Sequence, residues 1–362
     1  MTITAGNLYG SQDPRAMGMG IWLNLAVVNL SAFLRADRFF YVHLCQEEWK
    51  ALQKLLGKVS QMLITLVGVS FLTFCLTYLA PGDPAAMLLE AGDTIVSQET
   101  LDKTRAELGL DKPFLVQYVN WAGGVLQGDM GMSYSAKKPV TEKLLEGFAG
   151  TLTLAAVTIV FVLLISLPLG IWSAVHRNEW QDHVVRAVSF IGVSMPSFWI
   201  GLIFLYVFGL KLGWFPIAKS AVTAEGIVLP ALTLALYMSS KYIRQVRTVF
   251  LEELQQDYVV GARARGLSEQ AILWKHVLPN AVLPLITLLG MSIGWLLGGV
   301  AVIEMVFSWP GIGNMAVRAI SMRDYPLIEG FVLWISIVYM GINALVDLSY
   351  AYLDPRLRKE AR

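Results

Sequence analysis

Long uncharged apolar runs recur along this chain, and they restrict it to folds that can cross a lipid bilayer. A bilayer core about 30 Å thick needs roughly 20 apolar residues in a helix. Every backbone amide and carbonyl inside the lipid must also be hydrogen-bonded within the protein. The runs therefore predict an all-α integral membrane protein with six transmembrane helices, at residues 59–80, 151–175, 187–210, 226–243, 281–304 and 330–353.

Composition and missing motifs exclude several classes of function. Charged residues make up 15% of the chain, against roughly 25% in soluble domains, so a water-soluble enzyme is not expected. The net charge of +1 lacks the basic excess of a nucleic-acid-binding protein. The sequence contains no phosphate-binding G-x-x-x-x-G-K-[ST], no G-x-S-x-G and no H-E-x-x-H motif. We therefore expect no catalytic residue, no resident cofactor, no metal site and no nucleic-acid partner.

The distribution of basic residues predicts the topology. If the N-terminus is cytoplasmic, 18 of the 28 Lys and Arg residues fall on the cytoplasmic side, as the positive-inside rule requires. Six of the others lie in the long segment 81–150, where that rule is weak. The expected protein is a multi-pass membrane protein, surrounded by lipid, with both termini cytoplasmic.

The two ends of the chain fall outside the predicted transmembrane domain of residues 51–353. Residues 354–362 are expected to form a cytoplasmic tail. Residues 1–50 are expected to form an extension whose apolar stretch 17–34 is interrupted by Asn24, Asn29 and Ser31. An interfacial helix or poorly ordered tail, a seventh span and a start codon assigned too early all remain open for it.

Residues 81–150 are too long for a simple connection and predict a small extracytoplasmic helical loop. Ser97 is placed to cap a helix that Gly109 ends, and a second, amphipathic helix is expected over 114–126. A lid or docking face and a plain spacer are equally compatible with this pattern.

The predicted cytoplasmic segment 241–280 is basic and carries two sets of helix-end signals. A polar helix is expected to end at Gly266 in the left-handed conformation. Ser268 is placed to cap a second short helix, with Glu269 in its first turn, Lys275 and His276 in its last, and Pro279 beyond it. The pattern predicts a compact knob of two short helices joined at Gly266, although an ordinary helical loop has the same signals.

Two carboxylates adjoin or interrupt the last two predicted spans. Glu304 is expected near the outer surface and Asp347 near the inner end of its span, so they should not pair. An ionisable group in a span is a candidate functional residue. Each is equally compatible with an interfacial residue that caps a helix end.

From residue 55 onward the chain resembles the first membrane subunit of peptide and nickel ABC importers. The resemblance rests on an ordered series of segments: LAPGDP (79–84), ELGLDKP (107–113), GDMGMSY (128–134), GVSMPSFW (192–199), DYVVGARARGL (257–267), HVLPNAVLP (276–284), IEMVFSWPGIG (303–313), RDYPLI (323–328) and LVDLSYAYLDPRLR (345–358). The knob coincides with the EAA loop of that family, although the acidic-Ala-Ala start falls on Val260, Gly261 and Ala262, so the acidic residue is missing.

The resemblance implies half of a translocation pathway in the cytoplasmic (inner) membrane of a prokaryote, completed by a homologous second permease. It also implies two cytoplasmic ABC ATPases, which bind the ATP and Mg²⁺, and an extracytoplasmic substrate-binding protein. The knob would then be the ATPase-coupling loop, and the residues implied in coupling are Asp257, Tyr258, Gly261, Ala262, Ala264, Gly266, Leu278 and Pro279. Closure of the ATPases would move the knob and switch access from outside to inside.

The cargo is not decided by the sequence. Peptides and nickel, as an ion or a chelate, are both compatible with the resemblance. The competing class is a secondary transporter or channel subunit driven by an ion gradient, which would call for charges near the membrane midplane and inverted repeats within the chain. A purely structural membrane subunit is a third alternative.

The topology predicts opposite locations for two residues far from the termini. Reporter fusions after Gly128 and after Ala262 should be active on opposite sides of the membrane, because an odd number of predicted spans separates them. Activity of both fusions on the same side would contradict the topology.

Overall fold

The computed structural model describes residue 53 and residues 56–90, 97–217 and 222–353. The chain divides into two compact units, Met1–Leu63 with Arg356–Arg362, and Ile64–Pro355. Apart from the first two turns of the helix Leu56–Leu79, the features below belong to the second unit. The predicted extension 1–50 and tail 354–362 lie outside the described residues.

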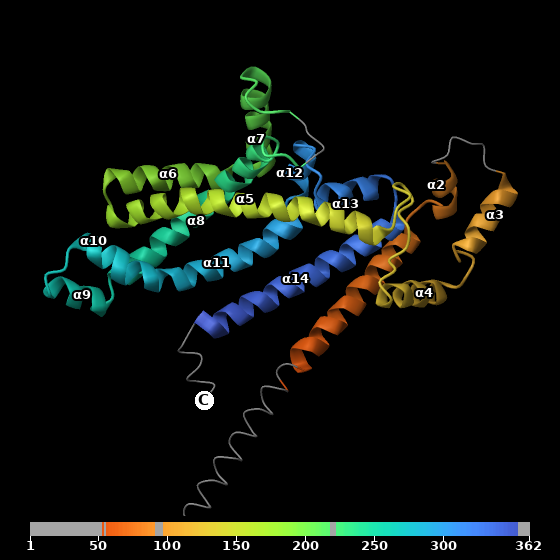
Figure 1. The fold of residues 1–362 in the computed structure, drawn as a ribbon, viewed down its shortest axis with the longest axis horizontal. Helices are drawn as coiled ribbons and strands as arrows, with labels where there is room; N and C mark the ends of the chain where they lie inside the picture. Colours follow the sequence, from red (N-terminus) through yellow and green to blue (C-terminus); the bar gives the residue numbers. More distant parts are fainter. Residues whose placement is uncertain (1–52, 54–55, 91–96, 218–221, 354–362) are drawn as a thin grey trace, which may run out of the picture. The chain divides into compact units, whose positions relative to one another are not determined.

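The described residues are helical, and their only β pairing is an isolated bridge between Met132 and Pro139. The helix Leu56–Leu79 comes first. The elements that follow are α2 (Pro84–Glu90), α3 (Gln98–Glu107), α4 (Phe114–Leu126), α5 (Val140–Val175), α6 (Trp180–Ser194), α7 (Ser197–Phe204), the π-helix η1 (Leu205–Lys211), α8 (Val228–Leu254), α9 (Asp257–Ala264), α10 (Glu269–Ile272), the π-helix η2 (Leu273–Val277), α11 (Leu278–Gly299), α12 (Ala301–Val306), α13 (Ile312–Ser321) and α14 (Tyr325–Leu353) (Figure 1). The all-α membrane fold is confirmed.

The count of six uninterrupted spans is not reached. Within the described residues, four helices are long and apolar enough to cross a membrane, or five if the bent pair of α6 and α7–η1 is one span. That pair bends by 97° because Pro196 lacks an amide proton and holds Met195 in an extended conformation. Helix α8 does not qualify since Lys241, Arg244 and Arg247 occupy its middle.

Helix α5 is longer than the predicted span because it begins at Val140 instead of residue 151. Glu142, Lys143 and Glu146 interrupt the uncharged run in the sequence, but the opposite face of the same turns buries Val140 and Leu144. Amphipathic turns therefore continue the helix beyond its apolar stretch.

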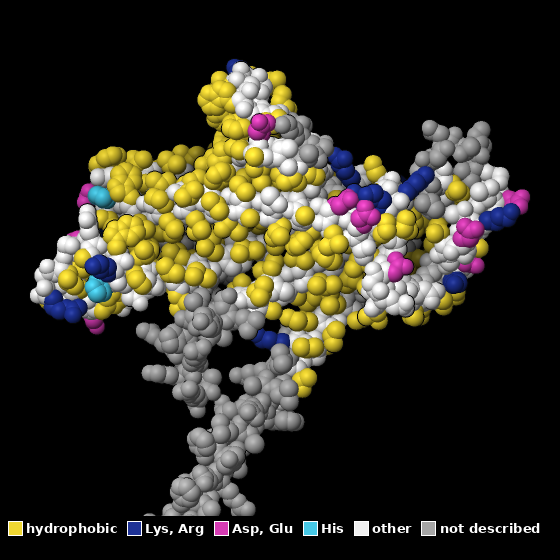
Figure 2. All heavy atoms as spheres, viewed as in Figure 1, with side chains coloured by type: hydrophobic (Ala, Val, Ile, Leu, Met, Phe, Trp, Pro, Cys, Tyr) yellow, Lys and Arg dark blue, Asp and Glu magenta, His cyan; other side chains and the backbone are white. Residues whose placement is uncertain are grey.

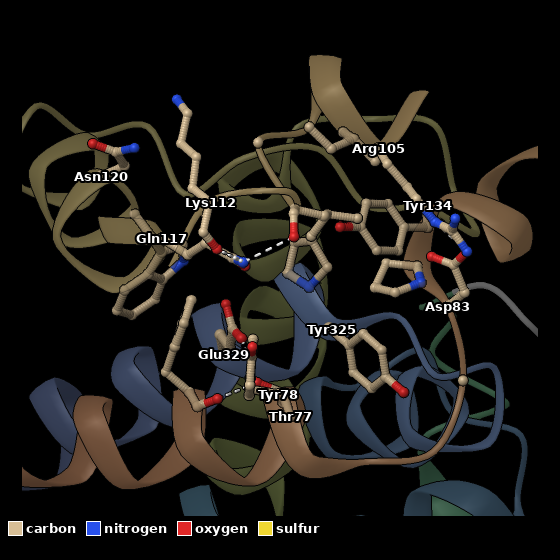
Figure 3. A pocket seen from close by; sticks show the side chains of 18 of the residues that line it. Thr77, Tyr78, Asp83, Arg105, Lys112, Gln117, Asn120, Tyr134, Tyr325 and Glu329 are labelled. Carbon is tan, nitrogen blue, oxygen red and sulfur yellow. Dashed lines mark hydrogen bonds and ion pairs between the residues drawn. The ribbon is translucent and has the colours of Figure 1, made fainter. Parts of the chain in front are cut away.

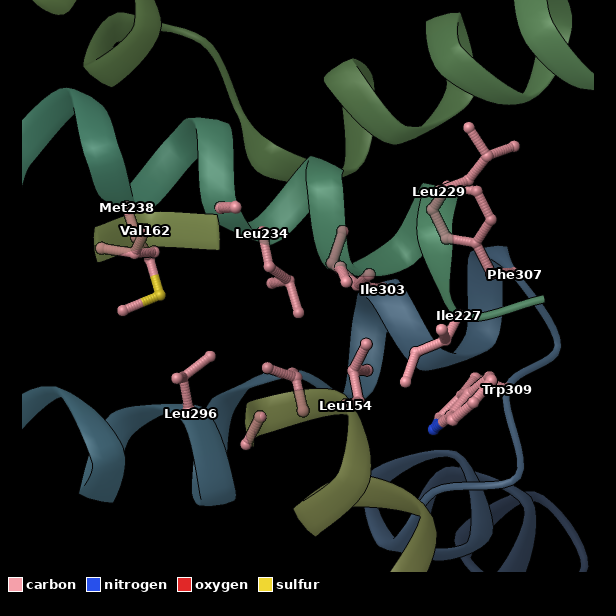
Figure 4. Close-up of a cluster of buried hydrophobic side chains, with 14 of the residues drawn as sticks. Leu154, Val162, Ile227, Leu229, Leu234, Met238, Leu296, Ile303, Phe307 and Trp309 are labelled. Carbon is pink, nitrogen blue, oxygen red and sulfur yellow. The ribbon is translucent and has the colours of Figure 1, made fainter. Parts of the chain in front are cut away.

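The hydrophobic core lies where α5, α8, α11 and α12 meet (Figure 4). Leu154 and Val162 of α5 contact Leu234 and Met238 of α8, and Leu296 of α11 joins them. Figure 2 shows hydrophobic side chains over the long helices, with charged ones gathered over α9–α10 and over the region of α2–α4 and α13. This separation is the pattern expected where lipid surrounds the middle of the helices.

A buried carboxylate ties the hairpin of α5 and α6 to α8. Asp182 is fully buried in α6 and accepts hydrogen bonds from Nε and a terminal nitrogen of Arg247, each at 2.7 Å. Ser173 Oγ donates to the same carboxylate at 2.6 Å and the Asn178 amide donates at 3.0 Å. Four hydrogen bonds thus compensate the charge of Asp182 and orient α8 against the hairpin.

Replacing Asp182 by Ala should strongly destabilise the protein. The change leaves the largely buried Arg247 without its counter-charge. Breaking a buried ion pair in this way lowers the free energy of unfolding by about 3–5 kcal/mol. Thermal unfolding of the detergent-purified protein would measure it. Asp102→Ala is the matched control, because Asp102 pairs with Arg105 at an exposed position and should change little. Equal melting temperatures for both variants would show that the Asp182 pair contributes no stability.

Candidate functional site

The segment 257–279, which the sequence singles out, consists of α9, a four-residue turn, α10 and the π-helix η2. Gly266 has φ +78° and lies in the turn, as the sequence predicts. Ser268 caps α10 by accepting a hydrogen bond from the Ala271 amide at 3.3 Å. Arg263 Nε donates to Glu269 Oε1 at 2.7 Å across the turn, and this hydrogen bond raises the pKa of Arg263.

The second helix of this segment does not end before Pro279 as expected. The chain continues from Glu269 to Gly294 as one helix, with η2 between α10 and α11. Pro279 lies at the start of α11, directly after the π-helical turn. At this first-turn position the missing amide proton of proline interrupts no hydrogen bond of α11. The first helix also differs, because α8 ends at Leu254 and α9 is a separate element.

Ala262 is not on the surface. Its side chain is 1% exposed and packs in a cluster with Val259 of α9, Phe250 of α8, Ile272 of α10 and Val277 of η2. Ala262, one of the residues that the resemblance implies in coupling, therefore packs inside this chain. Its small size serves the packing of the chain itself, since α9 lies against α8 and the start of α11.

The other predicted residues of the segment are spread over two faces. Asp257, Gly261, Ala264, Gly266 and Pro279 are exposed, whereas Tyr258 and Leu278 are half-buried. The Tyr258 hydroxyl donates to Glu253 Oε2 at 2.7 Å. The exposed apolar residues Val260, Leu267 and Trp274, of which Val260 is 58% exposed, were not singled out by the sequence. Their apolar character within an otherwise polar segment was the available signal for an exposed contact surface.

Glu304 is a fully buried residue of α12 and joins three helices. Thr151 of α5 donates its hydroxyl proton to Oε1. The Asn314 amide donates to Oε2 at 2.9 Å, and the Ile312 amide donates to Thr151 Oγ1 at 2.9 Å. A Cβ on Gly311 would collide with the Glu304 carboxyl group. The carboxylate therefore caps the N-terminus of α13, where the helix dipole favours a negative charge.

Asp347 lies in the α14 helix, but its side chain is outside the part of the chain that the structure describes. The structure does not bring it together with Glu304 by any described contact.

Asp324 is a buried carboxylate that the sequence reading did not single out. It accepts hydrogen bonds from Ser133 Oγ at 2.6 Å, from Ser135 Oγ at 2.7 Å, and from the amides of Tyr134 and Ser135. Asp324 belongs to the RDYPLI segment and Ser133 to the GDMGMSY segment, and Ser135 follows that segment directly. Both segments are among those that carry the family resemblance, and this was the available signal of a contact between them.

A pocket of about 550 Å³ lies next to this junction, and we call it the Glu329 pocket. It is enclosed by the end of the helix Leu56–Leu79, by α2 to α4, by the loop at Tyr134 and by the first turns of α14 (Figure 3). Thr77 Oγ1 donates to Glu329 Oε1 at 2.5 Å. Arg105 in the wall pairs with Asp83 at 2.6 Å, and hydrogen bonding to Asp83 raises the pKa of Arg105. The sequence could not reveal this pocket because its walls come from segments some 250 residues apart.

Comparison with known proteins agrees with these motifs. Residues 166–359 match the family described as "Binding-protein-dependent transport system inner membrane component", and residues 51–155 match its N-terminal counterpart. The chain is 38% identical over 307 residues to the glutathione transport system permease protein GsiC of Salmonella choleraesuis (strain SC-B67), which covers 85% of this chain and 98% of that protein. GsiC of Escherichia coli (strain K12) is 36% identical over the same coverage.

Among solved structures, an inward-facing MetNI methionine ABC transporter matches 58% of this chain and 96% of its own, at 21% identity and a TM-score of 0.48. The family matches and the membrane helices together show a multi-pass transport protein of a bacterial inner membrane, which is not an enzyme. Such a permease implies an ATPase and a substrate-binding protein as partners. This chain therefore belongs to the inner-membrane components of binding-protein-dependent transport systems, and it is the permease component of an ABC importer.

Proposed function

We propose that this chain forms one half of a pathway that imports short peptides, of the size of glutathione, and that a homologous permease supplies the other half. The observation that supports this choice of cargo is the 38% identity to a glutathione permease along 85% of the chain. Nickel, as an ion or a chelate, is the alternative cargo. Uptake by the complete importer in proteoliposomes tests the proposal: labelled glutathione or a dipeptide should enter with ATP, and ATP-driven entry of nickel alone would contradict it.

The segment 257–279 is the proposed coupling site for the two ATPases. Its buried residues form one cluster with residues of three long helices: Ile171 and Ala174 of α5, Val246 and Phe250 of α8, and Ala281 and Leu285 of α11. Because closely packed cores transmit displacement, a push on α9 would move the ends of all three helices together. This continuity supports a mechanical role for the segment.

The exposed side of the segment offers a surface for such a partner. Val260 and Trp274 are more than half exposed, and Leu267 is 39% exposed. Apolar side chains gathered on a polar loop are typical of interaction surfaces. We assign the ATPase contact to this side, with Gly261 and Ala264 on the exposed part of α9, and not to Ala262.

Gly266→Val should uncouple the importer without unfolding it. A Cβ at Gly266 would meet nothing within 4 Å, so the substitution causes no steric clash. Its cost comes from holding a β-branched residue at φ +78°, which is unfavourable by about 1 kcal/mol or more. The variant should reach the membrane at normal abundance and lose stimulation of ATP hydrolysis by loaded binding protein. Gly123→Val is the control, because Gly123 has equal space in α4 without a positive φ. Full stimulation in Gly266→Val would remove the coupling assignment.

Two further variants separate the core of the segment from its exposed surface. Ala262→Leu overfills a buried site and should lower the free energy of unfolding by about 1–3 kcal/mol. Its melting temperature and its ATPase stimulation should therefore both decrease. Val260→Asp should keep the melting temperature and lose stimulation, because its side chain lies outside that core. If Ala262→Leu is as stable as the wild type but uncoupled, Ala262 contacts a partner after all.

A further inference from the structure

The Glu329 pocket contains a buried carboxyl group that forms no ion pair with a Lys or Arg of the described residues, although Lys112 lies on the opposite wall. Glu329 is 6% exposed, and its Oε1 accepts the hydroxyl proton of Thr77. Its Oε2 has no hydrogen-bond partner among the described residues. Arg105, a basic residue in the wall, is already engaged with Asp83 and Asp102. Since burying an uncompensated carboxylate is costly, the pocket is suited to a ligand that brings a positive charge.

Aromatic rings surround this carboxylate. Phe74 and Tyr78 come from the helix Leu56–Leu79, Trp121 from α4, Tyr134 from the loop before α5, and Tyr325 from α14. Tyr325 and Glu329 are one helical turn apart on α14, so their side chains lie on the same face. Aromatic faces around a carboxylate are the arrangement that binds organic ammonium groups.

Two polar atoms in this aromatic wall are closed off from the open volume of the pocket and have no hydrogen-bond partner among the described residues. They are the hydroxyl of Tyr325, whose side chain is 7% exposed, and Nε1 of Trp121. Such atoms are rare in folded proteins and call for an explanation. Tyr134 adds a hydroxyl group that remains protonated, because burial and then the negative charge of Glu329 raise the pKa of its phenol. The pocket thus holds hydrogen-bonding groups beyond those that its own packing uses.

The opposite side of the pocket is polar. Gln117, Asn120 and Lys112 lie there, across from Glu329 and Tyr325 (Figure 3). An amide, an ammonium group and a buried carboxylate on facing walls suit a small zwitterion. A volume of about 550 Å³ falls within the range of small-molecule sites, roughly 300–1,000 Å³.

We propose that the Glu329 pocket binds the amino-terminal ammonium group of a short peptide, with Glu329 as its counter-ion and the rings of Tyr325 and Trp121 as its aromatic contacts. The site lies on the permease itself and is distinct from the coupling segment. The choice of a peptide as the ligand rests on the proposed function, but the ammonium specificity rests on the pocket alone.

Isothermal titration calorimetry tests the site on the full importer in lipid nanodiscs, without nucleotide or binding protein. The probe is L-alanyl-L-phenylalanine, compared with its N-acetyl form. The wild type should bind the free dipeptide, and acetylation should weaken binding about tenfold or more, because it removes the charge that pairs with Glu329. Glu329→Gln should have the same effect, since it keeps the acceptor for Thr77 but removes the charge.

The control is Glu99→Gln, which makes the same change at an exposed position of α3 outside the pocket and should leave the affinity unchanged. Tyr325→Leu should weaken dipeptide binding, because it removes an aromatic face that lines the pocket beside Glu329. This Tyr325 variant tests whether the pocket binds the dipeptide if Glu329→Gln fails to assemble.

No dipeptide binding by the wild type, equal affinity for the acetylated form, or unchanged affinity in a properly assembled Glu329→Gln would each overturn the proposal. Gly266→Val should retain dipeptide binding, so a failure of the coupling assignment is distinguishable from a failure of this site.

Discussion

The close packing of α5 against α8 is the interaction on which the other helices depend. Both large core clusters contain residues of these two helices, and α11 completes each of them. The approach requires small residues: a Cβ on Gly170 of α5 would lie 2.6 Å from Val246 of α8. In lipid, where apolar surfaces gain little from contacting one another, such close packing is a main source of helix association.

Buried carboxylates then position the parts that are not long helices. Asp182 joins the hairpin of α5 and α6 to α8, Glu304 joins α13 to α5, and Asp324 holds the loop at Ser133 to the start of α14. Each is fully buried and receives several hydrogen bonds, which is the condition for tolerating a charge away from water. Glu329 differs because, among the described residues, Thr77 alone donates a hydrogen bond to it, and that difference separates a candidate binding residue from the structural carboxylates.

The two ends of the 64–355 unit suit different tasks. At the segment 257–279, the apolar core is continuous with three long helices, so the segment is mechanically connected to them. At the Glu329 pocket, side chains from five helices and from the loop at Tyr134 leave about 550 Å³ open. A rigid connection suits the transmission of a movement, whereas an open pocket with unused hydrogen-bonding groups suits a ligand.

Local physical signals in the sequence were sufficient for much of the fold. Apolar runs predicted the long helices, and the signals at Ser97, Gly109, Gly266 and Ser268 predicted helix ends that the structure has, because a capping bond involves only neighbouring residues. The burial of Ala262, the capping role of Glu304 and the Glu329 pocket were decided by tertiary structure alone. Each depends on which segments, distant in sequence, come to lie against one another, and no local pattern contains that information.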